Sequence, residues 1–338
     1  MKMKLFCGIE GGATITKVVL FNEDGDVIAS TEGPSTNIWL DGVDVCHKRL
    51  YDLIEKAKSQ ATLSKEVVLD GLGMCMSGCE EDEANRKYER EFMSKYPNLT
   101  KSCTIASDTV GPLYTVSPKG GIVLIAGTGS NTLLINPDGT TGRCGGWGHL
   151  IGDEASAMWI SMKAVKAVFD DEDNLNKSPY DVAKVKELML QHFEISDKFG
   201  ILEHFYTNFN KSRFAGLCKK LAAAASEGKD PLCCNLFYEA GVALAKMVIA
   251  LKPKIHEDLL KCQFGLPIVC VGSVFKSWHL LKNGFIDTII SHYDKFTLMT
   301  LNCSSALGAA YLGAKATGFS LPIKHEKNSS ILYSHGTS

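Results

Sequence analysis

Short apolar runs separated by glycine-rich breaks open the chain and predict a sheet built from hairpins. Leu5–Glu10 is mainly apolar and ends at a glycine-rich break, after which β-branched and apolar residues resume over Thr16–Phe21. An acidic turn at 23–26, with the sequence EDGD, separates this run from a third at 27–29. Turns of this composition join antiparallel strands, so the segment predicts two or three strands.

The pattern then changes to helical spacing. Residues 43–61 place their apolar side chains on one stripe and predict an amphipathic helix. The strongly charged residues 80–96 predict an exposed helix. Two further strands are predicted at 67–76 and 102–106, and each ends in a short polar segment.

The opening pattern starts again in the middle of the chain. Residues 121–126 predict a strand, 127–130 (sequence GTGS) a glycine loop and 131–135 a second strand, followed by an NPDG turn at 136–139. A strand, a small-residue loop with a threonine, a strand and an acidic glycine turn therefore occur twice. We interpret the repetition as a duplicated architecture in which each copy contributes one phosphate-facing hairpin.

Helical spacing dominates after residue 152. Apolar residues recur every three or four positions over 182–193 and 236–251. The apolar strand predicted at Leu266–Val271 runs into a Gly-Ser turn, and the small residues of 304–316 predict a closely packed helix. The polar tail from His325 is expected to be loosely held.

Length and composition limit the possible classes of protein. A chain of 338 residues exceeds the roughly 250–300 that one core supports, which favours two domains, with a hinge near 118–120. The net charge of −2 and the absence of a basic block argue against a nucleic-acid or membrane-surface partner. The apolar run that ends at Glu10 is shorter than a signal-peptide core, and no apolar run reaches the roughly 18 residues of a membrane span.

The twelve cysteines are scattered from Cys7 to Cys303, and no C-x-x-C occurs with a matching cysteine or histidine partner. We therefore expect reduced thiols in the cytosol and no zinc site.

Two glycine loops are the first candidates for chemistry. Gly11-Gly12-Ala13-Thr14 and Gly127-Thr128-Gly129-Ser130 combine glycines, which let backbone N–H groups approach an anion, with a threonine hydroxyl. Neither has the spacing of a P-loop. Either loop alone is better explained as a hairpin turn, but two such loops in a duplicated pattern favour phosphate binding.

Two aspartates are candidates for catalysis or binding. Asp108 directly follows a predicted strand, where ligand-facing residues gather in open α/β sheets, although it also suits a helix N-cap. Asp153 occupies what looks like a helix start, and a capping carboxylate there stays ionised and able to accept a sugar hydroxyl.

Residues 142–152 contain five glycines, which predicts a constrained loop pressed against a ligand or another backbone. A Cys144/His149 nucleophile pair lacks a third orienting group, and Trp147 suits a core anchor equally well. Outside this loop, Asn37 offers an amide for hydroxyl recognition or simply belongs to a polar turn. The turn at 272–273 is compatible with an adenine ring beside bare backbone.

Taken together, these motifs resemble the N-acetylglucosamine kinases of animals. The likeness runs in order from about residue 5 to about residue 318 and rests on these segments: 9–14, Asn37-x-Trp39, 107–108, 126–131, 144–149, 152–154, 213–216, 265–268 and 271–274. The resemblance implies an α/β protein with the two-domain actin-like ATPase (ribonuclease H-like) fold, built from a duplicated mixed sheet plus helices around an interdomain cleft. It implies a smaller domain at 1–118, completed by about 318–338, and a larger domain at 119–317.

The resemblance also implies roles for individual residues. Asp108 would be the general base that takes the proton from the sugar 6-hydroxyl. Residues that would hold the sugar are Asn37, Asp108, Ser130, Asn131, Gly146, Trp147, Gly148, His149, Leu150 and Asp153. Residues that would contact ATP are Thr14, Thr128, Ala215, Gly272 and Lys276. Mg²⁺ would accompany ATP, and from its place beside the first loop we expect Glu10 to position the ion through water. Ala13 departs from the resemblance, since relatives carry a third glycine there, and its methyl group restricts φ.

The implied activity is ATP-dependent phosphorylation of N-acetyl-D-glucosamine at the 6-hydroxyl, in amino-sugar salvage, by a cytoplasmic homodimer. N-acetylmannosamine and muramyl-type sugars stay open as substrates. A rival with the same fold is an ATPase that activates iron–sulfur dehydratases, for which no cysteine pattern is evident. A rival of another class is a sugar sensor without catalysis.

Overall fold

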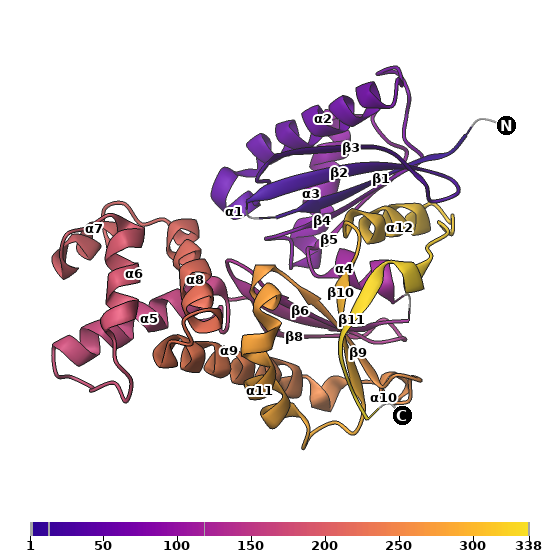
Figure 1. Cartoon of the computed structure of the whole chain (residues 1–338). Coiled ribbons are helices and arrows are strands. Elements are labelled where there is room, and N and C mark those ends of the chain that lie inside the picture. Colours follow the sequence, from indigo (N-terminus) through magenta and orange to yellow (C-terminus); the bar gives the residue numbers. More distant parts are fainter. Residues whose placement is uncertain (1–2, 13, 118, 337–338) are drawn as a thin grey trace.

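Two mixed sheets with the same strand order form the framework of this computed structural model, which describes residues 3–12, 14–117 and 119–336 (Figure 1). The first sheet has the order β3-β2-β1-β4-β5, in which β1 pairs antiparallel with β2 and parallel with β4. Its strands are β1 (Leu5–Gly11), β2 (Ile15–Asn22), β3 (Val27–Pro34), β4 (Gly71–Met76) and β5 (Cys103–Ser107).

The second sheet repeats this arrangement and adds one strand. Its order is β11-β10-β9-β6-β7-β8, and β6 pairs antiparallel with β7 and parallel with β9, as β1 does with β2 and β4. The duplication predicted from the two hairpin patterns is confirmed. Its strands are β6 (Gly121–Ala126), β7 (Ser130–Ile135), β8 (Thr141–Gly145), β9 (Leu266–Val271), β10 (Phe296–Leu301) and β11 (Ser329–His335).

Helices cover both faces of each sheet. On the first sheet, α2 and α3 bury apolar side chains against one face, and α12 covers the other. On the second, α5, α8, α9 and α11 share one core, whereas α4 lies on the opposite face. The α-helices are α1 (Ile38–Asp41), α2 (Val43–Gln60), α3 (Asp82–Lys95), α4 (Val110–Val116), α5 (Ala157–Glu172), α6 (Ala183–Phe193), α7 (Ile201–Phe205), α8 (Lys211–Ser226), α9 (Pro231–Ala250), α10 (Glu257–Leu260), α11 (Trp278–Ile289) and α12 (Ala306–Ala316). Short 3₁₀ turns are η1 (Lys198–Gly200), η2 (Lys252–Lys254), η3 (Ser273–Ser277) and η4 (His325–Lys327).

Helices α4 and α12 lie between the two sheets and connect the two halves (Figure 1). The small residues of α12 allow this, because its backbone lies directly on the first sheet. A Cβ on Gly8 or Gly73 would overlap a carbonyl oxygen of α12. The Gly308 N–H also donates to the Thr115 hydroxyl of α4 at 3.0 Å. The close packing predicted for 304–316 is therefore confirmed.

The tail differs from the expectation of a loosely held segment. Residues 329–335 form β11, which pairs antiparallel with β10 at the edge of the second sheet. Only the start of the segment assigned to the smaller domain reaches the first sheet, where Phe319 stacks on Phe6 with ring centroids 4.9 Å apart. An open sheet edge offers unpaired backbone groups, so a polar sequence can join it as a strand. Two positions singled out in the sequence, Ala13 and Pro118, lie outside the described residues.

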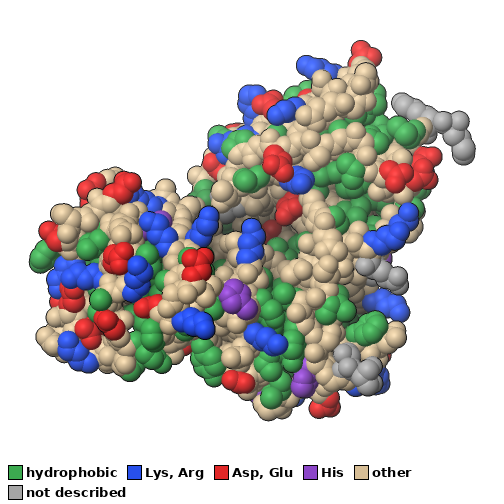
Figure 2. Space-filling model, in the orientation of Figure 1, with side chains coloured by type: hydrophobic (Ala, Val, Ile, Leu, Met, Phe, Trp, Pro, Cys, Tyr) green, Lys and Arg blue, Asp and Glu red, His purple; other side chains and the backbone are tan. Residues whose placement is uncertain are grey.

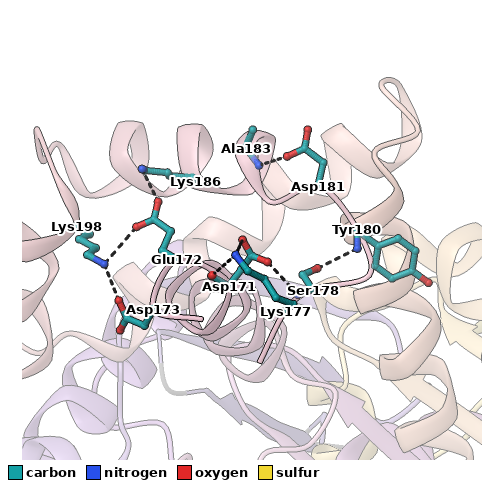
Figure 3. Close-up of polar contacts among 10 residues, drawn as sticks. All are labelled: Asp171, Glu172, Asp173, Lys177, Ser178, Tyr180, Asp181, Ala183, Lys186 and Lys198. Carbon is teal, nitrogen blue, oxygen red and sulfur yellow. Dashed lines mark hydrogen bonds and ion pairs between the residues drawn. The ribbon is translucent and has the colours of Figure 1, made fainter. Parts of the chain in front are cut away.

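A surface network of ion pairs and hydrogen bonds joins α5, α6 and η1 in the larger half (Figure 3). Glu172 at the end of α5 accepts ion pairs from Lys186 of α6 at 2.5 Å and from Lys198 of η1 at 3.5 Å. Asp171 accepts the Ser178 N–H at 3.0 Å in the intervening loop. These contacts hold together the helical group that supports α8.

Helix α9 is the one helix in the described ranges that is long and apolar enough to cross a membrane by length and composition. Its apolar side chains pack in the core, and Gly241 and Gly284 let it touch the backbone of α11. This packing is that of a core helix. Charged side chains of both signs are mixed over the visible face of the molecule (Figure 2).

Candidate active site

A cavity of about 860 Å³ lies between the two glycine loops and is lined by residues from both halves of the chain. The carboxyl ends of β1, β4 and β5 meet at its edge, because Gly11 pairs with Met76 and Met76 with Ser107 in the parallel register. Residues that line the cavity from the first half are Gly12, Thr14, Ile15, Asn37, Trp39, Leu40, Ser77, Gly78, Glu80 and Asp108. Those from the second half are Ile125, Gly127, Thr128, Gly129, Ser130, Asn131, Gly146, Gly148, His149, Asp153, Phe209, Asn210, Lys211 and Ser212.

Asp108 is half-buried in this cavity. Its carboxylate accepts the Ser107 hydroxyl at 3.3 Å. Burial, and after it the negative charge of Glu80, raise the pKa of Asp108 to about 6, against the opposing effect of hydroxyl donors. A carboxyl group with such a pKa is ionised at neutral pH and can still accept a proton, as a general base must.

The alternative role of Asp108 as a helix N-cap is wrong. Helix α4 begins at Val110, and its N-cap is Thr109, with no capping hydrogen bond from a side chain. The Asp108 carboxylate is therefore left to face the cavity.

The second glycine loop is anchored to α5. The Gly127 carbonyl accepts the Ala157 N–H at 2.8 Å, and the Gly127 N–H donates to the Gly129 carbonyl at 2.9 Å. Thr128 lines the cavity across from Thr14 of the first loop. The cavity therefore brings both predicted phosphate loops together with Asp108.

Asp153 is buried and links the second loop to α8. One carboxylate oxygen accepts the Ser130 N–H at 3.0 Å, and the other accepts Lys211 Nζ at 2.6 Å. Asp153 does not cap a helix, because α5 is capped by Ser156, whose hydroxyl accepts the Trp159 N–H. It adopts a left-handed φ of 62°, a strained conformation that is common at functional sites.

Two buried polar atoms beside Asp153 have no hydrogen-bond partner among the described residues. They are Ser130 Oγ and Asn131 Oδ1, and both residues line the cavity. Buried polar atoms are nearly always paired, so unpaired ones in a cavity indicate a place where a polar ligand completes the hydrogen bonds.

Arg143 of β8 binds the glycine-rich turn that begins at the end of this strand. The guanidinium donates to the Gly146 carbonyl at 2.6 Å and the Gly145 carbonyl at 3.1 Å, and it stacks over the Trp147 ring at 4.7 Å. Gly145, Gly146 and Gly148 all have φ near +80°, a conformation in which side chains are strained. The glycines are thus required by the backbone turn.

The side chains of this loop divide into two groups. His149 lines the cavity and stacks on Phe209 with ring centroids 5.0 Å apart, and burial and the Lys211 charge lower its pKa, which favours the neutral imidazole. Trp147 and Leu150 are 64% and 87% exposed and do not belong to the cavity lining. The alternative of Trp147 as a core anchor is wrong. Cys144 lies in β8 and, unlike His149, is not among the described residues that line the cavity.

Asn37 caps a short helix in a polar turn and also lines the cavity. Its side-chain oxygen caps α1 by accepting the Trp39 N–H at 3.0 Å. Its amide nitrogen lies 3.5 Å from Ser77 Oγ at the cavity wall. The Trp39 indole donates to the Gly78 carbonyl at 3.1 Å, which fixes this corner of the cavity.

Three residues expected near the nucleotide lie outside the lining. Gly272 touches the start of the second loop, since a Cβ there would lie 2.8 Å from the Gly127 backbone nitrogen. Ala215 is buried in α8, one turn after Lys211, and Lys276 is exposed on η3.

Sequence reasoning missed two charged residues of the cavity, Glu80 and Lys211. Glu80 stands three residues after Ser77, and its carboxylate accepts the Gly78 N–H at 3.3 Å. The polar residues that follow β4 were a signal for it. Lys211 had no motif, although Asn210 before a helical pattern is a typical N-cap.

The described residues contain no group of three or more side chains arranged to hold a metal ion. Glu10 lines a second hollow of about 600 Å³ that shares Gly12 and Ile15 with the first cavity. Its carboxylate accepts the Ser304 hydroxyl at 2.8 Å. A single carboxylate of this kind suits a metal that arrives with its own ligands, such as Mg²⁺ on a nucleotide.

Residues 7–313 match the model of the BadF/BadG/BcrA/BcrD ATPase family. An N-acetyl-D-glucosamine kinase of Dictyostelium discoideum is 24% identical over 327 residues, which cover 92% of this chain and 98% of that protein. An N-acetylmuramic acid/N-acetylglucosamine kinase of Clostridium acetobutylicum is 24% identical over 313 residues, with coverage of 92% and 98%.

Solved structures share the fold. A Chromobacterium violaceum protein, provisionally named an N-acetylglucosamine kinase, has a TM-score of 0.72 and 24% identity, with 92% of this chain and 99% of that chain covered. A ROK family glucokinase of Streptomyces griseus, solved with glucose and AMPPNP, has a TM-score of 0.57 and 13% identity, with coverage of 93% and 99%. The expected two-domain α/β fold of actin-like sugar kinases is confirmed.

Proposed function

The chain belongs to the BadF/BadG/BcrA/BcrD ATPase family, and on this premise we propose that it is a kinase that transfers the γ-phosphoryl group of ATP to the 6-hydroxyl of N-acetyl-D-glucosamine. The names of two relatives matched over 92% of the chain support the sugar. The observation that carries the proposal is the cavity that Asp108 shares with Thr14 and Thr128.

The transfer moves one proton, forms one phosphorus–oxygen bond and breaks another. Asp108 takes the proton from the sugar 6-hydroxyl as that oxygen bonds to the γ-phosphorus. The bond from the γ-phosphorus to the bridging oxygen breaks, and ADP leaves with its electrons. A pKa near 6 lets Asp108 act at neutral pH.

The two glycine loops would hold the phosphates of ATP through backbone N–H groups and the hydroxyls of Thr14 and Thr128. Because Gly272 lies against the second loop, the adenosine would extend toward Gly272, Ala215 and Lys276. Mg²⁺ bound to the phosphates supplies charge neutralisation, and Glu10 is the carboxylate that would position it through water.

The sugar would complete the unpaired hydrogen bonds of the cavity. Ser130 offers a hydroxyl and Asn131 Oδ1 an acceptor for the hydroxyl and N-acetyl groups of the sugar. The Asn37 amide nitrogen adds a donor. The loop from Gly146 to Leu150 and Asp153 would enclose the remaining side of the ring, with Trp147 and Leu150 at the exposed rim. The resemblance to animal kinases further supports a cytoplasmic homodimer.

A coupled assay of ADP release with a panel of amino sugars tests the proposal. We expect ADP release that requires N-acetylglucosamine, with phosphate on oxygen 6 in the NMR spectrum of the product. Preference for N-acetylmannosamine or a muramyl sugar would change the substrate and keep the kinase. Sugar-independent release would point to an ATPase activator, and no release with any sugar would point to a sensor; either result would refute the proposal.

A further inference from the structure

The cavity contains three carboxylates, Asp108, Glu80 and Asp153, but among the described lining residues Lys211 is the one lysine or arginine. Burial and the charge of Lys211 lower the pKa of His149, which disfavours a second positive charge there. A phosphoryl group that carries several negative charges would meet a mainly negative cavity without this ammonium group. The positive charge of Lys211 is therefore the main side-chain charge in the described lining that can offset the charge of a phosphate.

Lys211 lies against the second glycine loop. Its Nζ is 2.6 Å from Asp153 Oδ2, and a Cβ added to Gly129 would lie 3.1 Å from the same nitrogen. The ammonium group thus occupies the position between a sugar-binding candidate and a phosphate loop. The Lys211 side chain is 33% exposed, whereas that of Asp153 is 5% exposed, so the lysine can move without unpacking the core.

Helix α8 strengthens the positive charge at this point. Lys211 is its first residue, and the N-cap Asn210 accepts the Arg213 N–H at 2.9 Å. The first N–H groups of a helix have no partners within the helix, and the N-terminus carries a partial positive charge. This 16-residue helix begins at the cavity wall, and the lining includes Asn210, Lys211 and Ser212.

Asp153 does not need Lys211 to keep its position. Its other oxygen is held by the Ser130 N–H at 3.0 Å, and its backbone carbonyl accepts the Ser156 N–H at 3.0 Å. If Lys211 turned toward a phosphate, Asp153 Oδ2 would be free to accept a sugar hydroxyl. Breaking the one ion pair would then free Lys211 for the phosphate and Asp153 for the sugar.

We propose that Lys211 is a catalytic cation that leaves Asp153 to pair with the γ-phosphoryl group of ATP while that group passes to the sugar. This inference rests on the proposed function. Lys211 donates hydrogen bonds to phosphoryl oxygens and transfers no proton, since the proton of the sugar hydroxyl goes to Asp108. Its charge offsets the charge that spreads over the phosphoryl oxygens in the transition state.

The test compares nucleotides with and without a γ-phosphate. Calorimetry with Mg²⁺ measures the affinity for AMPPNP and for ADP in the parent and in Lys211→Met, which keeps the length of the side chain and removes its charge. We expect AMPPNP binding to weaken by about 10- to 100-fold and ADP binding by less than about threefold. Lys211→Arg is expected to recover most of the AMPPNP affinity.

Lys219→Met is the matched control, because it removes a charge from an exposed position on the same helix. Its affinities should equal those of the parent. Equal weakening of AMPPNP and ADP by Lys211→Met, or a rise in the sugar KM alone, would overturn the inference and leave Lys211 as a support for Asp153. Thermal melting shows that each variant is folded, and a failure of Lys211→Arg to recover AMPPNP affinity lost in Lys211→Met would also contradict the inference. Failure of the proposed function would appear separately, as no sugar-dependent ADP release by the parent.

Discussion

The backbone N–H of Asp108 donates to the carbonyl oxygen of Met76 at 3.1 Å, one residue beyond the last pair that joins β4 and β5. The sheet therefore holds the Asp108 backbone independently of what its carboxylate does. A substitution that changes only the carboxylate should leave the wall of the cavity in place.

Asp108→Asn is the direct test of the general base. The amide has the same shape but cannot accept the proton, so we expect turnover to fall by at least about 10²-fold with ATP binding nearly unchanged. Steady-state rates and nucleotide calorimetry measure the two effects. Near-normal turnover would exclude Asp108 from the role of base.

The pH dependence should follow the pKa of Asp108, which burial and Glu80 raise to about 6. The ionised carboxylate is the active form, so kcat/KM should fall about tenfold for each pH unit well below this value. Glu80→Gln removes a neighbouring negative charge, which makes ionisation easier and should move the acidic limb to lower pH. Glu83→Gln, at an exposed position of α3, is the control. An acidic limb that Glu80→Gln does not move would contradict the coupling.

Thr128→Val tests the second loop. The substitution removes a hydroxyl donor with little change in volume, and we expect the KM for ATP to rise more than the KM for the sugar. Initial rates with each substrate varied in turn measure both constants. If the sugar KM rises more, the loop does not bind phosphate.

Ser130→Ala separates binding from stability. The Ser130 hydroxyl oxygen is buried without a partner, so its removal should not lower the free energy of unfolding of the ligand-free protein by more than about 1 kcal/mol, and can raise it. The KM for the sugar should increase severalfold. Urea unfolding and sugar kinetics measure the two quantities, and a large loss of stability with an unchanged sugar KM would show that the hydroxyl is structural.

Gly73→Ala tests the contact between α12 and the first sheet. The added methyl group would overlap the Ala309 carbonyl oxygen, so we expect the free energy of unfolding to fall by about 1–3 kcal/mol. Gly142→Ala is the control in the second sheet, since its nearest neighbour is a Lys254 side-chain carbon at 3.1 Å that can move away. If the two substitutions lower the free energy of unfolding equally, the close contact between Gly73 and α12 does not specifically require glycine.

Much of the fold was predictable because strand and helix signals are local. The runs at 5–10, 121–126 and 266–271 lie within β1, β6 and β9, and the repeated hairpin pattern correctly predicted two sheets of the same topology. The prediction for the tail was wrong, because β11 pairs with the backbone of β10 and packs Leu332 and Tyr333 against the core, and neither contact is encoded in the local sequence.

The candidate site was predictable where a residue follows a strand or belongs to a glycine loop, as Asp108 and Thr128 do. Glycines and turn residues record backbone geometry in the local sequence. The sequence by itself thus determined the duplicated sheets, both loops and the place of Asp108 at a strand end.

Only the tertiary structure decided which charges meet in the cavity. Lys211 and Asp153 stand 58 positions apart, and no pattern in either segment refers to the other. Their contact exists because α5 and α8 pack through one apolar core, which places the start of α8 beside the second loop. Apolar packing is non-directional, so the chain alone does not specify which polar ends it brings together.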